Sequence, residues 1–324
     1  MPSPLRTLRR RVLTPNTAET KLAKRGFHEK SPEARELLET VGSRFLEGYA
    51  YAVESGAPAE AEHRLENVPH RFRGFAYEGA GMGFAMLDGL PLQGRGWVGG
   101  FLAGRGADHH YMVYVGIGWA MARLPRFCWP DITALDPLLR WLVLDGYGFH
   151  QAYFATDRYV HGRFRERAFP WPADDSPGYV NRAIDQGIGR ALWFVGGTDP
   201  GVVAGLIERF HESRHSDLYG GAGLAAAYAG GVDEAELRDF RERAGAHRAI
   251  VAQGAAFACE ARIHAGLLGP HTELAAEVLC GTSAAAAAKV TQDLRPTGRS
   301  NGPVPSFETW RRSIADAFAT TGRN

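Results

Sequence analysis

The 324-residue chain carries 37 Lys and Arg against 36 Asp and Glu, and 45% of its residues are hydrophobic. This balance excludes an intrinsically disordered chain and a nucleic-acid-binding protein that relies on a basic surface. The three cysteines, Cys128, Cys259 and Cys280, are too few and too scattered for a disulfide framework or a zinc ribbon. No apolar run reaches the ~18 residues that cross a bilayer, and no signal-peptide core follows the charged start. We therefore expect a cytoplasmic protein without a transmembrane segment.

Residues 1–30 are basic, with eight Lys and Arg against two Glu, so they carry +6 and the remainder of the chain carries −5. They predict a basic N-terminal extension. Two interpretations are open: a solvated tail lying on the acidic body, or an arm that binds an anionic membrane or an acidic partner protein.

The glycines of the chain, 40 in all, recur in a pattern. A polar or small residue precedes Gly-x-Gly, and a bulky residue and then Ala or a near equivalent follow. The first glycines of the copies are Gly79, Gly116, Gly146, Gly187, Gly221 and Gly254, so the spacings are 37, 30, 41, 34 and 33 residues. A period near 34 is typical of tetratricopeptide-like helix-turn-helix repeats.

The segments within a copy fit a pair of helices. A helix after Gly187 is followed by a break at 196–200 and a second helix over 202–207, and the next copy has its partner helix over 234–243. Asp199 and Asp233 are suitable N-caps. The stretch 90–108 predicts a loop or a short hairpin, and 163–179 an inserted loop.

The predicted fold is all-α, a superhelical stack of about six tetratricopeptide-like helical hairpins over residues 31–295. Residues 296–324 predict a linker and a C-terminal capping helix. A glycine inside a helix costs about 1 kcal/mol relative to Ala, so paired glycines suggest close contact between helix backbones. The alternative, a phosphate-binding loop, needs a preceding β-strand and rarely occurs six times in one protein.

The densest polar groups lie in the third and fourth copies. Candidate catalytic residues are Asp145, His150, Asp185 and Arg190. Stacked repeats align equivalent positions, so polar residues of different copies would line one groove with aromatic side chains. The candidate substrate-binding residues are Glu78, Trp119, Phe149, Gln151, Tyr153, Gln186, Trp193 and Gln253.

Such a cluster would transfer protons on a hydrophobic substrate. The alternative is structural: the polar groups would bond to adjacent helix ends and fix the register between repeats. We expect neither a metal nor a cofactor. His109 and His110 are adjacent and point apart, and Cys280 lies in an apolar run that favours an inert core thiol.

Four segments carry a resemblance to a known family: 75–82, 114–120, 141–154 and 185–194. With the rest of residues 35–293, they resemble the UnbL-type enediyne biosynthesis proteins. The resemblance implies a role beside an iterative polyketide synthase, in turning a linear polyene into the enediyne core of an antibiotic. It supplies no catalytic residues.

The leading functional hypothesis is an accessory protein or cofactor-independent enzyme of enediyne core biosynthesis that holds a hydrophobic polyene. Asp145 and His150 would be its acid/base pair, and Arg190 would orient a polar end of the substrate. The alternatives are a non-catalytic helical-repeat scaffold that recruits the polyketide synthase or other pathway proteins, and a carrier for a reactive product.

Overall fold

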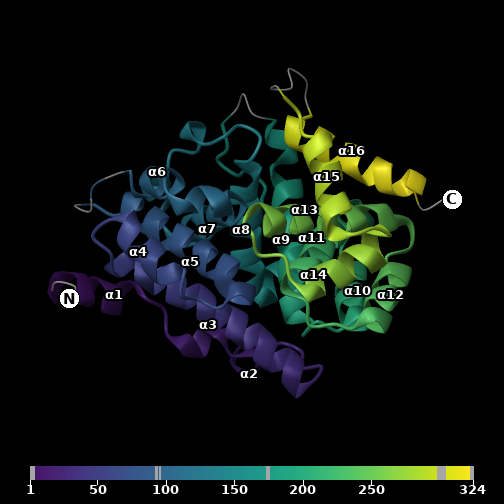
Figure 1. The fold of residues 1–324 in the computed structure, drawn as a ribbon, viewed down its shortest axis with the longest axis horizontal. Coiled ribbons are helices and arrows are strands. Elements are labelled where there is room, and N and C mark those ends of the chain that lie inside the picture. Colours follow the sequence, from purple (N-terminus) through teal and green to yellow (C-terminus); the bar gives the residue numbers. More distant parts are fainter. Residues whose placement is uncertain (1–3, 92–93, 95, 173–175, 298–303, 322–324) are drawn as a thin grey trace.

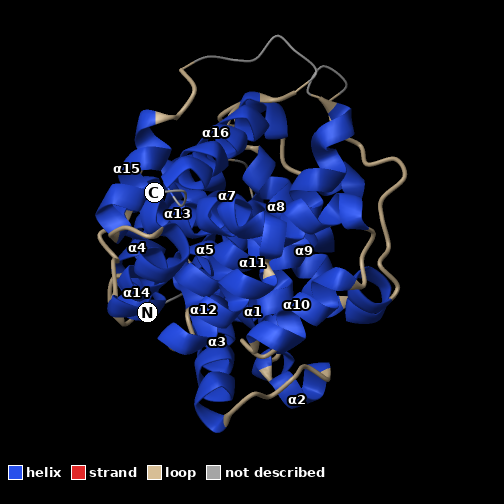
Figure 2. Cartoon of the chain, turned by 90° about the vertical axis from the view of Figure 1, so that its right-hand side faces the viewer, coloured by secondary structure: helices blue, strands red, loops and turns tan. Residues whose placement is uncertain are grey.

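The computed structural model describes residues 4–91, 94, 96–172, 176–297 and 304–321. Every regular element among these residues is a helix, as Figure 2 shows. The prediction of an all-α fold is therefore confirmed.

Seven long helices of the described chain carry the glycine motif, and each packs against the next in chain order (Figure 1). They are α3 (Pro32–Glu54), α5 (His70–Gly89), α7 (His110–Arg123), α8 (Trp141–Phe154), α9 (Val180–Val195), α11 (Glu212–Ala229) and α13 (Arg248–His264). The motif lies inside each helix rather than at its start.

Short helices form a second layer between successive long ones. They are α4 (Pro58–Leu65), α6 (Trp97–Leu102), α10 (Pro200–Glu208), α12 (Glu234–Arg243) and α14 (Pro270–Ala275). Helix α4 contacts α6, and α12 contacts both α10 and α14. Among the described residues, the segments after α7 and α8 hold only short helical turns, at Arg126–Cys128, Ile132–Ala134, Asp157–His161 and Pro177–Tyr179. Uniform hairpins therefore do not run through the middle of the stack.

The N-cap predictions are confirmed. Asp199 accepts a hydrogen bond from the N–H of Val202 at the start of α10, and Asp233 forms a capping box with Glu236 at the start of α12. The stretch 90–108 departs from the expected loop or hairpin, because it contains α6 and the short turn Arg105–His109.

Helix α6 begins where a distant side chain caps it. Both carboxylate oxygens of Asp88, at the end of α5, accept hydrogen bonds from the N–H groups of Trp97 and Val98. This cap comes from nine residues upstream, so no local pattern shows it. The insertion 163–179 is a loop that ends in the short turn Pro177–Tyr179, and residues 173–175 lie outside the described residues.

The glycines meet in pairs at the seams between neighbouring long helices. A Cβ added at Gly118 would overlap the carbonyl oxygen of Val143, and one at Gly146 would overlap that of Val115. Each of these carbonyls belongs to the residue three positions before the partner glycine. The same reciprocal contact occurs at six seams, which pair Gly48 with Gly79, Gly81 with Gly116, Gly118 with Gly146, Gly148 with Gly187, Gly189 with Gly221, and Gly223 with Gly254.

The order of the pairs explains the Gly-x-Gly spacing. In each interior helix the first glycine contacts the preceding helix and the second contacts the following one. The first helix, α3, has only the second glycine, Gly48, and α13 has only the first, Gly254. The copy in α3 is harder to recognise from sequence, because bulky Tyr49 follows Gly48, whereas in α13 two small residues follow Gly254.

Neighbouring long helices run parallel. Asp185 precedes the motif of α9 and bonds to Arg214, which precedes the motif of α11. Phe149 follows the motif of α8 and packs against Phe194, which follows the motif of α9. Residues at corresponding ends of neighbouring helices therefore meet, as parallel packing requires. The helix direction turns along the stack. Arg262, near the end of α13, consequently donates to the carbonyl oxygen of Arg71, at the start of α5, over 2.9 Å. The stack thus curves back on itself.

The basic N-terminal extension docks on the body. Helix α1 (Pro4–Leu13) lies against α3, where Arg9 Nη2 donates to the carbonyl oxygen of Ser55 over 2.7 Å and Arg10 pairs with Glu54. A helix end leaves its last carbonyls unsatisfied, and these arginines serve that end of α3. A second short helix, α2 (Leu22–Arg25), leads into α3.

Two further helices complete the chain. Helix α15 (Ala284–Asp293) packs on α13, and α16 (Ser306–Thr321) packs on both. Trp310 Nε1 donates to the carbonyl oxygen of Thr291, and the buried Arg311 pairs with Asp217 of α11. Residues 298–303 of the predicted linker lie outside the described residues.

A substitution at a seam tests the fold. In G187A the new methyl group would overlap the backbone of α8 at Asp145 and force the two helices apart. We expect a loss of at least about 3 kcal/mol in the free energy of unfolding, measured by urea denaturation. The control is G205A in α10, where a Cβ meets nothing within 4 Å. Because Ala has a higher helix propensity than Gly, G205A should raise the free energy of unfolding by as much as about 1 kcal/mol. Equal stability of the two variants would contradict the seam.

Candidate functional site

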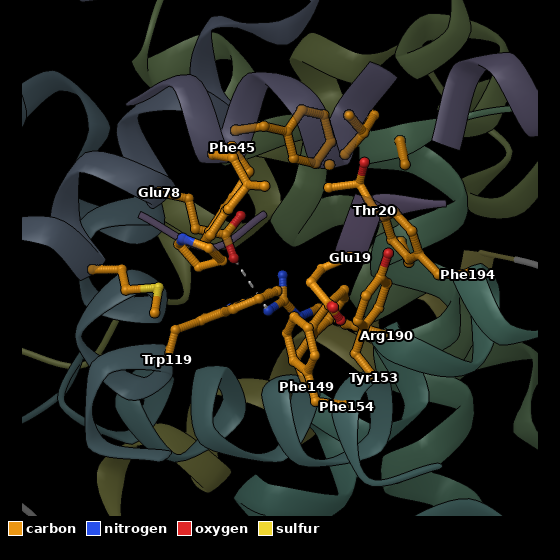
Figure 3. A pocket seen from close by; sticks show the side chains of 18 of the residues that line it. Glu19, Thr20, Phe45, Glu78, Trp119, Phe149, Tyr153, Phe154, Arg190 and Phe194 are labelled. Atoms are coloured by element: carbon orange, nitrogen blue, oxygen red, sulfur yellow. Dashed lines mark ion pairs between the residues drawn. The ribbon is translucent and has the colours of Figure 1, made fainter. Parts of the chain in front are cut away.

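The inner side of the curved stack holds an apolar cavity. We call it the aromatic chamber. Its walls come from α3, α5, α7, α8, α9 and α11, and Figure 3 shows their rings around one space. The aromatic lining residues are Phe45, Phe75, Trp119, Phe149, Tyr153, Phe154, Phe194 and Tyr228.

The glycine motif itself places the lining. The residue directly after the second glycine faces the chamber in five successive helices: Met82, Trp119, Phe149, Arg190 and Leu224. The residue before the first glycine lies four positions earlier, one helical turn away on the same face. In α5 and α8 these residues are Glu78 and Asp145. Close approach at the seams thus turns the position after the second glycine towards a shared interior in five helices, and the position before the first glycine in α5, α7 and α8.

A second cavity lies beyond the aromatic chamber, and we call it the second chamber. Arg190, Leu224 and Tyr228 border both cavities. The second chamber is also apolar, and its other walls include Tyr111, Met112, Val115, Leu142, Asp145, Phe257 and Trp310.

Arg190 forms a buried polar centre where the chambers meet. Its Nε lies 2.7 Å from Asp145 Oδ1, and its Nη2 lies 4.0 Å from Glu78 Oε1, the pair marked by the dashed line in Figure 3. The guanidinium carbon is 5.0 Å from the centre of the Phe149 ring. Only 6% of Arg190, 4% of Glu78 and 2% of Asp145 is exposed. One cation therefore serves two carboxyl groups in an apolar surrounding.

Burial changes the protonation of these carboxyl groups. It raises the pKa of Glu78 to about 7, with Arg190 and Trp119 opposing the rise and Asp145 adding to it. Burial also raises the pKa of Asp145, again against the pull of Arg190. Because Asp145 makes the closer contact with Arg190, Glu78 is the carboxyl group that exchanges a proton near neutral pH.

His150 lies in different surroundings from Asp145. The two are five residues apart on α8 and point about 140° apart around its axis. The His150 ring packs edge-on against Trp119, at 5.6 Å, and lies 4.7 Å from the ring of Phe154. Burial lowers its pKa to about 3, so the imidazole is neutral. The structure does not bring the proposed acid/base pair together.

Several other candidates join helices instead of lining a cavity. Asp185 forms a buried, two-oxygen contact with Arg214 of α11, and burial raises the pKa of Asp185 to about 6. Gln253 accepts a hydrogen bond from Arg311 Nε over 3.3 Å. Trp193 Nε1 donates to the carbonyl oxygen of Gly230. These side chains therefore join neighbouring helices, as the alternative interpretation of the sequence expected.

The two remaining glutamines also lie outside the chamber walls. Gln151 donates to the hydroxyl groups of Tyr147 and Tyr159. Gln186 is buried beside Asp145, and its side chain helps to lower the pKa of that carboxyl group. Of the twelve candidates, Glu78, Trp119, Phe149, Tyr153 and Arg190 line the aromatic chamber, and Asp145 and Arg190 line the second.

Sequence reasoning missed several lining residues. Tyr228 follows Leu224 by one helical turn, so extending the inward face of α11 would have found it. Phe45 lies three residues before Gly48, in the unrecognised copy of the motif. Phe194 follows Arg190 by the same spacing of one helical turn, so the same extension of the inward face of α9 would have found it. Phe154 lies five residues after Phe149, and the motif does not point to it.

The N-terminal extension forms part of the chamber wall. Pro15, Glu19 and Thr20 line it beside Arg123 of α7. Arg25 pairs with Glu19, and its guanidinium lies 4.8 Å from the centre of the Phe154 ring. The extension thus covers the aromatic chamber, a role that its charge did not suggest.

Within the part of the chain that the structure describes, no group of three or more His, Cys, Asp or Glu side chains could hold a metal ion. Nor is any described helix both long enough and apolar enough to span a bilayer.

The fold and cavities define a class: an all-α protein whose parallel helices enclose an apolar interior with one charged centre. The chain belongs to the family described as "Protein of unknown function (DUF1702)", which matches residues 4–318. No curated protein and no solved structure shows detectable similarity to it.

The titration of Glu78 yields a stability test. Its folded-state pKa of about 7 exceeds the ordinary 4.5, so folding favours the protonated carboxyl group. The resulting stabilisation is complete below pH 4.5 and is lost as the pH rises to about 7. E78Q does not titrate. Relative to wild type, E78Q should therefore gain about 3 kcal/mol in the free energy of unfolding over this range.

Urea denaturation at several pH values measures this difference. The control is E277Q, which makes the same substitution at an exposed glutamate away from the buried cluster. A difference between E78Q and wild type that does not change with pH would show that Glu78 is ionised throughout.

Proposed function

We propose that this protein binds a linear, conjugated, apolar molecule in the aromatic chamber and acts in enediyne core biosynthesis, on a polyene released by an iterative polyketide synthase. It does so as an accessory protein or a cofactor-independent enzyme. The observation that carries this proposal is the chamber itself, an apolar interior lined by eight aromatic rings with one polar centre.

The character of the chamber favours such a ligand. Apolar ligands gain about 25 cal/mol for each Å² removed from water, and ring faces offer planar conjugated chains a stacking surface. A pocket with few polar groups fixes one end of a ligand and accepts the rest by shape. The resemblance to the UnbL-type proteins supplies the polyene as a candidate of this class.

Within this proposal the polar roles shift from the sequence-based hypothesis. Arg190 keeps the role of orienting a polar group, and Asp145 holds Arg190 in place. Glu78 replaces His150 as the candidate proton-transfer group, because it faces the chamber and titrates near neutral pH.

Filling the chamber tests the proposal. Ala225 is buried and lines the aromatic chamber, so A225L projects a larger side chain into it. We expect at least a tenfold loss of affinity for a fluorescent linear tetraene, with the far-UV circular dichroism unchanged. A246L, at an exposed alanine, is the matched control. In the producing strain, A225L should lower the enediyne titre. Unchanged tetraene affinity in A225L would overturn the proposal.

A second candidate function, a scaffold for pathway proteins, rests on α1. Leu5, Leu8 and Val12 are 78%, 57% and 71% exposed and follow one face of this helix. An exposed apolar stripe of this kind is a protein-docking feature. The scaffold predicts that the purified polyketide synthase of the pathway binds wild type, and that L5S/L8S/V12S loses this binding while keeping tetraene affinity. Equal binding of both forms would exclude this surface.

A further inference from the structure

Three residues of the aromatic chamber carry buried donor atoms that form no hydrogen bond of normal geometry with the described part of the chain. The atoms are Arg190 Nε and Nη2, Trp119 Nε1 and the hydroxyl group of Tyr228, from α9, α7 and α11. Each of the three residues is more than nine-tenths buried. An unpaired buried donor costs about 1–3 kcal/mol, so a fold that keeps several of them around one cavity is suited to an acceptor atom of a ligand.

The charges around these donors restrict that acceptor. Arg190 already contacts Asp145 at 2.7 Å and faces Glu78 at 4.0 Å. A ligand carboxylate would add a third acid to one buried cation, which the desolvation of charged groups strongly opposes. A neutral oxygen avoids this cost and still gains a charge-assisted hydrogen bond from the guanidinium.

The position of the donors restricts the ligand further. Arg190 and Tyr228 border both chambers, and most of the other side chains that line each chamber are apolar. An oxygen bound there has an apolar cavity on either side. A carbonyl group, with two substituents and an acceptor oxygen between them, has this shape.

We propose that Arg190, Trp119 and Tyr228 bind the oxygen of a neutral carbonyl group on the ligand. Its conjugated chain lies in the aromatic chamber and the carbonyl's other substituent lies in the second chamber. This assignment rests on the proposed function and names its substrate class, a linear polyene ketone or ester. Asp145 acts as a positioning residue, because it fixes the Arg190 guanidinium through Nε.

Three probes of equal chain length separate this inference from the proposed function: a linear tetraene hydrocarbon, the corresponding tetraene methyl ketone and the corresponding carboxylic acid. Binding is followed by quenching of tryptophan fluorescence. Hydrogen bonds to charged groups are worth about 1.5–3 kcal/mol, so the ketone should bind wild type about 10- to 100-fold more tightly than the hydrocarbon. The acid should bind more weakly than the ketone at pH 8.

Conservative variants locate the contact. Y228F removes only a hydroxyl group and W119F only the indole N–H, and each should weaken ketone binding about 2- to 12-fold without changing hydrocarbon binding. Y219F, on the same helix as Tyr228 but with its hydroxyl at the Arg243 carbonyl, is the matched control and should change neither. The bound ketone should also absorb at longer wavelength in wild type than in Y228F, because a hydrogen bond polarises the conjugated carbonyl.

Arg190 is tested together with its counterion, since R190M alone would leave Asp145 buried without a cation. R190M/D145N should weaken ketone binding at least as much as Y228F or W119F does, without changing hydrocarbon binding. Equal affinity of ketone and hydrocarbon for wild type would overturn the carbonyl site and leave the proposed function standing. Tightest binding by the acid would also overturn it, in favour of an anion site. Failure of all three probes to bind would overturn the proposed function itself.

Discussion

The structure depends on the close approach of helix backbones at glycine. At each seam two glycines lie against carbonyl oxygens of the opposite helix, and neither position has room for a Cβ. Contacts between a Cα–H group and a carbonyl oxygen contribute about 0.5–1 kcal/mol each, and small residues let the flanking side chains interlock. The loss of helix propensity at about 1 kcal/mol per glycine is offset only if both partners stay in register. This requirement explains why the glycines come in reciprocal pairs and why the terminal helices of the array need one each.

The same constraint builds the site. A seam fixes the rotation of a helix about its axis as well as its distance from the neighbour, so the residue after the second glycine always faces inwards. Most copies place a large apolar side chain there, and the ninth helix, α9, places Arg190. A departure at one repeat position thus puts a single cation into an otherwise apolar interior. Glu78 and Asp145 meet it because they occupy the equivalent position one turn earlier in α5 and α8.

The repeat could be recognised from sequence because its period and its small residues are local signals. The all-α class, the caps at Asp199 and Asp233, and the inward row of Glu78 and Asp145 all follow from spacing. The failures share a cause: they depend on contacts between distant segments. Three features depend on the tertiary arrangement of the helices, which the repeat period does not predict. They are the Asp88 cap of α6, the contact of Arg190 with α5, and the cover formed by residues 15–20. Pairing Asp145 with His150 relied on closeness in sequence, although five residues along a helix separate two faces.

The curvature also decides which polar residues remain available for chemistry. Asp185, Gln253 and Trp193 each complete a bond to a neighbouring helix or to α16, so their hydrogen-bonding capacity is used by the fold. The groups around Arg190 differ, because the geometry that gathers them leaves buried donors of α7, α9 and α11 without hydrogen bonds of normal geometry to the described residues. Folding stability alone would favour apolar residues in place of these polar groups, because replacing a buried ion pair by apolar residues of similar volume often costs no stability. Their retention at the junction of two cavities is an argument for a ligand, and their number and charge point to a neutral oxygen.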